Sequence, residues 1–214
     1  MRHRGLLGLV FAAMLGLLAP AVTRADLLVY ATNSTASAGG TGSFEVVVQN
    51  TSTDGTSYNI SSFNTLLEVT NGTGLTFTGA DGSTTSFGYI FGSVQFAPLG
   101  VVVGDTITLS DYEATSFVTL AAGQSLGLGN VTYSLAPGAP LDSINPIVIN
   151  FGLTQIYDDS NPALEITLNT PQGGAVTVTA SAVPEPGTIV LAGLVSSLGG
   201  VCVYKRKRTS RVVA

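Results

Sequence analysis

The sequence predicts an all-β protein, a single jelly-roll-like β-sandwich that lies between two apolar end segments. Three observations favour this fold class. Residues 26–182 are rich in Gly, Ser, Thr and Val and contain few strong helix formers. Short runs such as Phe44, Val46 and Val48 place apolar residues at every second position, which is typical of strands with one buried face. Turn pairs such as Asp54-Gly55 and Pro137-Gly138 separate these runs.

The central 157 residues are enough for one domain with a single core. No long segment within them has the period of an amphipathic helix. The expected strands, in chain order, are Leu27–Ala31, Ser43–Asn50, Ser57–Val69, Leu75–Gly79, Gly88–Phe96, Asp105–Leu109, Thr115–Leu120, Ser125–Leu135, Ile147–Phe151, Leu164–Leu168 and Ala175–Ser181.

The N-terminal residues have the layout of a secretory signal peptide. Arg2 and Arg4 precede an apolar run from Leu6 to Ala19, and small residues follow the run. We therefore expect residues 1–25 to be a signal peptide that is cleaved after Ala25. Cleavage after Ala21 is the alternative. An uncleaved anchor fits less well because the apolar run is short.

A second apolar segment lies near the C-terminus. The run Gly187–Tyr204 has 18 residues and no charged side chain, which is enough for a helix that just spans the hydrocarbon core of a bilayer. The basic cluster that follows it should stay on the cytoplasmic side by the positive-inside rule. The sequence thus predicts a single-pass transmembrane helix over 187–204 and a cytoplasmic tail over 209–214. The residues of the basic cluster are Lys205, Arg206, Lys207 and Arg208.

The segment before the apolar run contains two prolines, Pro184 and Pro186, on either side of Glu185. Each proline forces the residue before it into an extended conformation, so Val183–Pro186 is expected to be a stiff, strand-like peptide next to the membrane. This geometry suits a protease that binds an extended peptide. The alternative is an ordinary tail anchor whose prolines only end the stalk.

The tag Pro184-Glu185-Pro186, the apolar helix and the basic cluster occur in the order of the PEP-CTERM sorting signal, and residues 183–208 resemble that signal. The resemblance implies a bacterial envelope protein that is exported, held in the membrane and processed near the tag by an exosortase. It also implies a link to exopolysaccharide and biofilm matrix. The tail Thr209–Ala214 is longer than the pattern requires, which slightly weakens the match.

Charged residues are strongly segregated along the chain. All eight Lys and Arg lie in the two end segments, the one histidine is His3, and the one cysteine is Cys202. Residues 26–182 carry twelve carboxylates and no cation, so their side-chain charge is about −12 near neutral pH. This composition excludes a phosphate-binding lysine loop, Ser-His-Asp or Cys-His catalysis, zinc sites built on His or Cys, and disulfides in the domain. It also argues against nucleic-acid binding.

Two kinds of chemistry remain for a domain with only carboxylates. One is glycoside hydrolysis by a pair of acids, and the other is binding of a hard cation such as calcium. We expect no cofactor, with calcium as the alternative. The local acid clusters are Asp111 with Glu113, and the turn formed by Asp158, Asp159 and Asn161. The second cluster is the candidate metal site, although it lacks the spacing of an EF-hand. A solvated acidic loop is the alternative for both clusters.

Glycan binding is a further candidate function. The domain has no tryptophan, but Tyr112 and Tyr157 lie beside the two acid clusters and are the candidate glycan-binding residues. Both tyrosines are alternatively rim or core residues. The segments Ser43–Asn50, Ile60–Val69 and Leu128–Leu135 resemble, in this order, cohesin-like and related carbohydrate-binding sandwiches. That resemblance implies the fold only.

Taken together, the sequence predicts an exported, non-enzymatic protein of the cell envelope or extracellular matrix. Its expected partners are an exosortase-type processing enzyme, the membrane and exopolysaccharide, with no nucleic acid. The alternatives are a glycan-binding or adhesive module, with or without calcium, and an acid-only glycosidase.

The sorting tag can be tested by the double substitution Pro184→Ala/Pro186→Ala. We expect the variant to accumulate as an unprocessed membrane form, because the tag would lose its rigid extended backbone. Cell fractionation followed by intact mass measurement checks both location and processing. Processing at the wild-type rate and position would contradict tag recognition, and a full-length product in the cytosol would contradict export.

Overall fold

The structure is a computed structural model that describes residues 26–70, 74–83, 86–113, 115–160 and 162–180. The predicted signal peptide, the sorting tag, the apolar run and the basic cluster lie outside the described residues. Within the described ranges, no helix has the length and hydrophobicity needed to cross a membrane. The chain divides into two compact units, Met1–Val178 and Thr179–Ala214, and the fold described below belongs to the first, with Thr179 ending its last strand.

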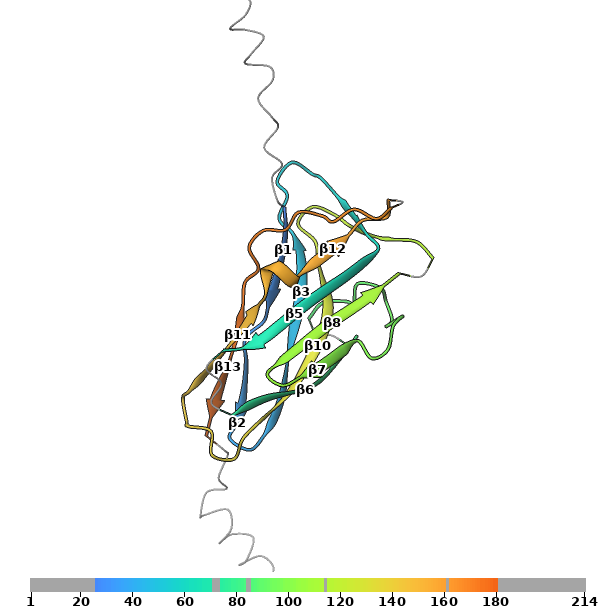
Figure 1. The fold of residues 1–214 in the computed structure, drawn as a ribbon. Coiled ribbons are helices and arrows are strands. Elements are labelled where there is room, and N and C mark those ends of the chain that lie inside the picture. Colours follow the sequence, from blue (N-terminus) through green and yellow to red (C-terminus); the bar gives the residue numbers. More distant parts are fainter. Residues whose placement is uncertain (1–25, 71–73, 84–85, 114, 161, 181–214) are drawn as a thin grey trace, which may run out of the picture. The chain divides into compact units, whose positions relative to one another are not determined.

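Two β-sheets form a sandwich (Figure 1). The smaller sheet has the order β1 (Leu27–Ala31), β3 (Thr41–Asn50), β10 (Ser125–Leu135) and β6 (Leu75–Asp81), with antiparallel neighbours. The larger sheet has the order β2 (Ser34–Ser37), β13 (Gly174–Thr179), β11 (Ile144–Ile149), β5 (Ser62–Val69), β8 (Thr106–Tyr112) and β7 (Gly100–Val103), and β12 (Gln155–Tyr157) also pairs with β5. The short strands β4 (Tyr58–Ile60) and β9 (Val118–Leu120) form a separate pair.

The core lies between the two sheets and follows from the period-two pattern of the strands. On β3 the side chains of Phe44, Val46 and Val48 point inward, and on β8 those of Ile107 and Leu109 do so. These five side chains are at most 2% exposed. Burial of this apolar surface is the main favourable term in folding, at about 25 cal/mol per Å².

A buried tyrosine joins the two sheets. Tyr133 of β10 is fully buried, and its hydroxyl is hydrogen-bonded to the Ser34 hydroxyl of β2 at 2.9 Å. A side chain at Gly42, across the ladder from Tyr133, would collide with the tyrosine ring, so only glycine fits there. Burial raises the pKa of Tyr133, so the phenol keeps its proton in more alkaline solution than an exposed tyrosine does.

β5 lies at the centre of the larger sheet and determines which distant segments meet. One edge of β5 pairs with β8 along its whole length. The other edge is shared, because β11 pairs with residues 67–69 and β12 pairs with residues 62–64. A single 3₁₀ turn, η1 (Phe151–Leu153), connects the two. The ends of β8 and β12 are therefore neighbours across β5, although about 45 residues separate them in the chain.

The predicted all-β sandwich is confirmed, and β1 and β10 have the bounds expected from the sequence. Two expected strands are wrong: Gly88–Phe96 and Leu164–Leu168 form no strand, only isolated bridges. The expected strand Ser57–Val69 is broken at Ser61, whose N–H and C=O bond instead to Tyr157 and Glu113. The short strands β2, β7 and β12 were not expected.

One polar atom of the core has no partner in the described part of the chain. Thr65 of β5 is fully buried, and its Oγ1 makes no hydrogen bond. Substitution Thr65→Val keeps the shape and removes the hydroxyl, so we expect the free energy of unfolding to rise by about 1 kcal/mol. Denaturant unfolding followed by fluorescence measures the change.

Thr65→Ser serves as the control for this prediction, because it keeps the hydroxyl and loses the methyl group. We expect that variant to be less stable by about 1 kcal/mol. If both variants lose stability to the same extent, the Thr65 hydroxyl has a partner and the interpretation is wrong.

Candidate interaction face and its acidic pocket

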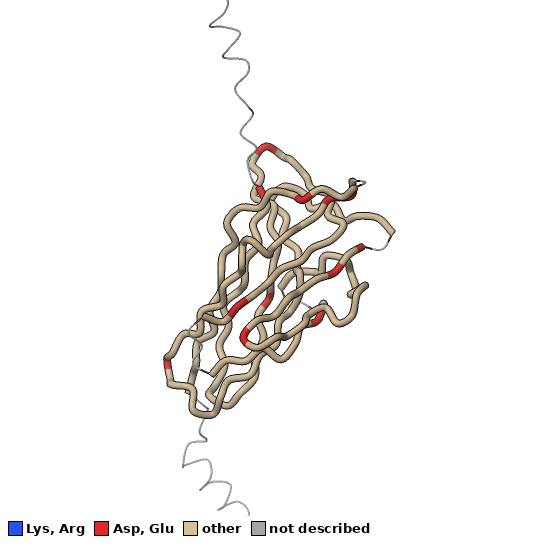
Figure 2. Tube along the Cα trace, in the orientation of Figure 1, with Lys and Arg blue, Asp and Glu red and all other residues tan. Residues whose placement is uncertain are grey.

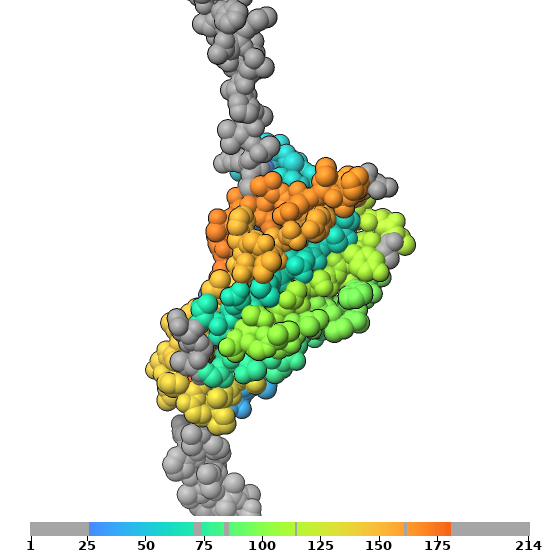
Figure 3. Space-filling model, in the orientation of Figure 1, coloured from blue at the N-terminus to red at the C-terminus, as the bar shows by residue number. Residues whose placement is uncertain are grey.

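The outward side of β11, β12, β5, β8 and β7, called here the open face, carries the candidate site. Figure 3 shows this side of the molecule, with β5 turquoise and β7 and β8 green. Five large apolar side chains that point outward from these strands are between 40% and 69% exposed. They are Val101, Val103, Tyr112, Ile144 and Val148. The sheet therefore presents an apolar surface to solvent.

The remaining outward positions of the open face are mostly small and uncharged. Ser62 and Asn64 of β5 lie opposite Tyr112 and Ser110 of β8. Glu68 is the one acidic residue at an outward position of β5, and the Asn150 amide donates to its Oε1 at 3.0 Å. A mixture of apolar and uncharged polar groups, poor in charge at its centre, is typical of protein–protein interfaces.

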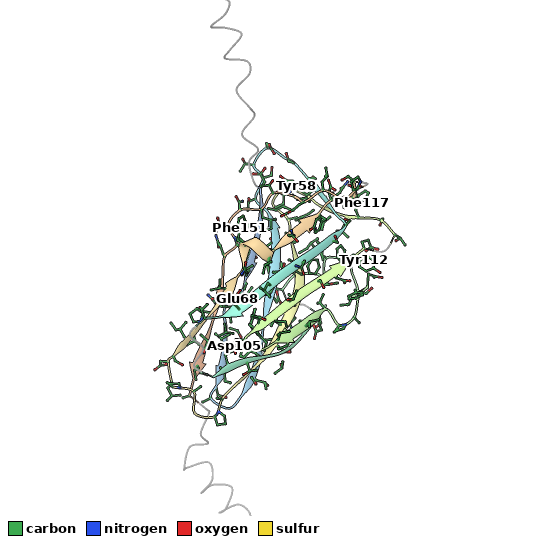
Figure 4. All side chains as sticks on the ribbon, in the orientation of Figure 1. Tyr58, Glu68, Asp105, Tyr112, Phe117 and Phe151 are labelled. Atoms are coloured by element: carbon green, nitrogen blue, oxygen red, sulfur yellow. The ribbon has the colours of Figure 1, made fainter. Side chains whose placement is uncertain are left out.

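Two of the residues proposed from sequence lie in one row on this face. Ser62 of β5 pairs with Tyr112 on one side and with Tyr157 on the other. Directly paired residues point to the same side of a sheet, and adjacent strands are about 4.8 Å apart. The two tyrosines thus flank Ser62, with Tyr112 exposed (Figure 4) and Tyr157 half-buried.

A small cleft opens beside Tyr112. The ring centroids of Phe96 and Tyr112 are 6.4 Å apart, and their planes are inclined at 47°. Together with Ser62, Phe63 and Ser110 these rings line a cleft of about 260 Å³, called here the aromatic cleft. Phe96 is exposed and comes from the segment that follows β6. Phe96 was not among the site residues expected from the sequence, because its segment was expected to be a strand.

A buried carboxylate holds the aromatic cleft in shape. Asp111 is only 3% exposed, and its oxygens accept hydrogen bonds from the Tyr89 hydroxyl at 2.6 Å and from the backbone N–H of Phe96 at 2.8 Å. The N–H groups of Gln95 and Tyr112 also donate to it. Burial, followed by the bond and charge of Asp111, raises the pKa of Tyr89 well above its usual value. Tyr89 therefore stays protonated and keeps donating to Asp111.

Glu113 of the first acid cluster meets Asp158 and Asp159 of the second in a separate hollow, called here the acidic pocket. It has a volume of about 440 Å³, and Glu113, from just after β8, and Asp158 and Asp159, from just after β12, line it. Its other lining residues are Ser61, Thr115, Ser116, Phe117, Ser160 and Ala163. Figure 2 shows acidic residues gathered at this end of the sandwich. Asp111, the other residue of the first acid cluster, does not line the pocket because its side chain points into the core.

The carboxylate of Asp158 is fixed by local hydrogen bonds. Its Oδ1 accepts from the hydroxyl and the N–H of Ser160 and from the N–H of Leu164 at 2.8 Å. These bonds, led by the Ser160 hydroxyl, hold the pKa of Asp158 below its usual range. Asp158 thus stays ionised in mildly acidic solution. A general acid of a glycosidase needs the opposite, a raised pKa.

The carboxylates of the pocket do not converge as metal ligands do. In the ranges that the structure describes, no three acidic, histidine or cysteine side chains are placed to hold one metal ion. Asn161, the third residue of the metal site proposed from sequence, lies outside those ranges. Calcium binding by Asp158, Asp159 and Asn161 therefore stays a prediction.

Comparison with solved structures identifies the fold as similar to that of cohesin domains. A cohesin in a type I cohesin–dockerin complex from Clostridium thermocellum is 16% identical, with a TM-score of 0.54 over 74% of this chain and 96% of the cohesin. A non-cellulosomal cohesin from the archaeon Archaeoglobus fulgidus is 15% identical, with a TM-score of 0.51 over 77% and 96% of the two chains. At these identities the likeness shows the fold alone. No family model matches the chain, and no curated protein matches it.

Asp111 provides a test of how the cleft is held. Because Asp111→Ala leaves buried donors without an acceptor, we expect the free energy of unfolding to fall by about 3 kcal/mol. Hydrogen exchange at the amides of Gln95 and Phe96 should become faster. Denaturant unfolding and exchange measured by mass spectrometry check both effects.

Two comparisons make the Asp111 result specific. Tyr89→Phe removes one donor and should cost about 1 kcal/mol. Asp105→Ala removes an exposed carboxylate and should change stability by less than about 0.5 kcal/mol. If Asp111→Ala behaves like Asp105→Ala, Asp111 does not hold the segment that carries Phe96.

Proposed function

We propose that this protein is an exported, non-enzymatic binding module that engages a partner protein through the open face. The observation that carries the proposal is a sheet surface with five exposed apolar side chains and no cation. Exposed apolar patches of this kind mark sites of interaction. The similarity to cohesin domains supports it, because the neighbour from Clostridium thermocellum was crystallised with a dockerin.

The proposal that the module is non-enzymatic rests on the residue types available. Residues 26–182 contain no His, Lys, Arg or Cys, so a nucleophile activated by a histidine, or a lysine that forms a Schiff base, has no candidate. Carboxylate pairs remain, and Glu113 faces the same pocket as Asp158 and Asp159. The lowered pKa of Asp158 favours binding over acid catalysis at that position.

For location, we propose the route that the end segments imply. A signal peptide over 1–25 exports the chain, the helix 187–204 holds it in the inner membrane, and an exosortase-type enzyme processes it near Pro184-Glu185-Pro186. The mature domain then acts in the cell envelope or extracellular matrix, in association with exopolysaccharide. These steps rest on the resemblance of residues 183–208 to the sorting signal.

Glycan binding is the second candidate function, and the pair Phe96–Tyr112 is the observation that favours it. Aromatic rings beside carboxylates and hydroxyls suit a sugar ring. The open face, however, extends over β5, β7 and β11, well beyond the cleft, which fits a protein partner better. Glycan arrays with and without a calcium chelator separate the candidates, since a protein-binding module should give no signal in either condition.

Site-specific photo-crosslinking tests the open face in the cell. Amine-reactive crosslinkers find no side chain to react with in the domain, because residues 26–182 contain no lysine. A photo-reactive phenylalanine analogue at Val148, on the open face, should yield a discrete adduct with one envelope protein. The same analogue at Thr76, exposed on β6 of the other sheet, should yield none. Immunoblotting and mass spectrometry of the adduct give the result.

A competition experiment makes the adduct specific. An excess of purified wild-type protein should suppress the Val148 adduct, whereas the variant Val101→Glu/Val148→Glu should not, because buried charges disrupt an apolar interface. Thr76→Glu is the matched control and should compete like the wild type. Equal adducts from Val148 and Thr76, or competition by all variants alike, would rule out the open face as the binding surface.

A further inference from the structure

We infer that the partner is a cationic polypeptide, anchored by an apolar side chain in the aromatic cleft and by a lysine or arginine in the acidic pocket. This inference rests on the proposed function and adds to it the chemistry of the partner and the position of the anchor. Interfaces concentrate their binding energy in a few such pockets.

The two hollows are direct neighbours. Ser62 and Tyr112 line the aromatic cleft, and the residues next to them in the chain, Ser61 and Glu113, line the acidic pocket. The register of β5 with β8 fixes this arrangement, since Ser62 pairs with Tyr112. Successive residues of an extended peptide are about 3.3 Å apart. Side chains close together in one peptide can therefore enter both hollows at once.

The charge of the pocket selects a cation. Glu113, Asp158 and Asp159 line it, and residues 26–182 supply no cationic side chain that could neutralise them. Carboxylates gathered in one cleft repel each other, and an ammonium or guanidinium group between them relieves that repulsion. The ring of Phe117 also lines the pocket and is exposed, which suits a cation held against an aromatic face.

The same charges disfavour other occupants. A second copy of the domain brings no Lys, Arg or His within residues 26–182, so it cannot fill the pocket with a cation and would add to the repulsion. A neutral glycan would leave the three carboxylates without counter-charges. An arginine or lysine at the end of a flexible side chain fits a pocket of about 440 Å³ whose carboxylates are spread around its wall.

Both hollows are held in place before binding. Three donors to Asp111, from Tyr89, Gln95 and Phe96, fix the segment that carries Phe96. The bonds from Ser160 and Leu164 fix Asp158. A site that needs little ordering loses less conformational entropy on binding. This favours recognition of a short, well-defined segment of the partner.

The experiment is a selection of random twelve-residue peptides displayed on phage against the full-length protein in detergent micelles. We expect the enriched peptides to contain Lys or Arg close to an aromatic or aliphatic residue. Synthetic copies should bind the variant Glu113→Gln/Asp158→Asn/Asp159→Asn about tenfold or more weakly than the wild type. Raising the salt concentration from roughly 0.05 M to roughly 0.5 M should weaken binding to the wild type strongly.

A control variant with the same change in charge distinguishes binding in the acidic pocket from attraction to the overall negative charge of the domain. The variant Asp81→Asn/Asp105→Asn/Asp142→Asn also removes three carboxylates, and all three are exposed residues outside the pocket. It should bind the peptides within about twofold of the wild type. Phe96→Ala should weaken binding without changing its dependence on salt. Circular dichroism and unfolding curves verify that each variant is folded.

The outcomes distinguish this inference from the proposed function. If the peptides lack cations, or bind both triple variants alike, the anchor is wrong. If these peptides nevertheless fail to bind Val101→Glu/Val148→Glu, the open face remains the binding surface and only the proposed anchor is wrong. If no peptide is enriched and neutral glycans bind without dependence on salt, both proposals are wrong. Binding that is lost equally in both triple variants would indicate attraction to the overall charge and would also overturn the anchor.

Discussion

The sandwich has to accommodate twelve carboxylates with no cationic side chain in residues 26–182. Ion pairs are unavailable to the domain, so a carboxylate either accepts hydrogen bonds from neutral donors or faces water. Asp111 shows the first solution, because it is buried and takes its hydrogen bonds from a phenol and from backbone N–H groups. The exposed Asp54 uses the same kind of donor: the hydroxyls of Ser52 and Thr56 lower its pKa to about 2.

This constraint links the interior to the surface. Three of the four donors to Asp111 come from the segment between β6 and β7, so satisfying a buried carboxylate also places Phe96 next to Tyr112. The acids that no backbone segment surrounds, Glu113 and Asp159, are left along the acidic pocket. The absence of cations thus accounts both for the hydrogen bonds that Asp111 accepts in the core and for the uncompensated carboxylates of the acidic pocket.

The sequence predicted the fold well where the pattern of a strand is local. Alternation of Phe44, Val46 and Val48 is sufficient to identify β3, because one face of that strand meets the core along its length. It failed at Gly88–Phe96, where the backbone leaves the neighbouring strand after a short contact. Gly88 and Ile90 bond to Gly127 of β10, but the N–H groups of Gln95 and Phe96 bond to the buried side chain of Asp111. Three-residue strands such as β12 carry too few residues to show a period. The meeting of Glu113 with Asp158 could not be predicted either, since it depends on two strands sharing the edges of β5.

Loss of the end segments would change the electrostatics of the chain more than its fold. The whole chain has a formal charge of −5, whereas residues 26–182 alone carry about −12, because every Lys and Arg lies outside them. A domain with that charge repels its own copies and anionic lipid head groups. Without the end segments, the domain has no cationic side chain that would attract it to an anionic surface. A partner that supplies positive charge would offset this repulsion, and the acidic pocket beside the aromatic cleft is where we propose that such a partner binds.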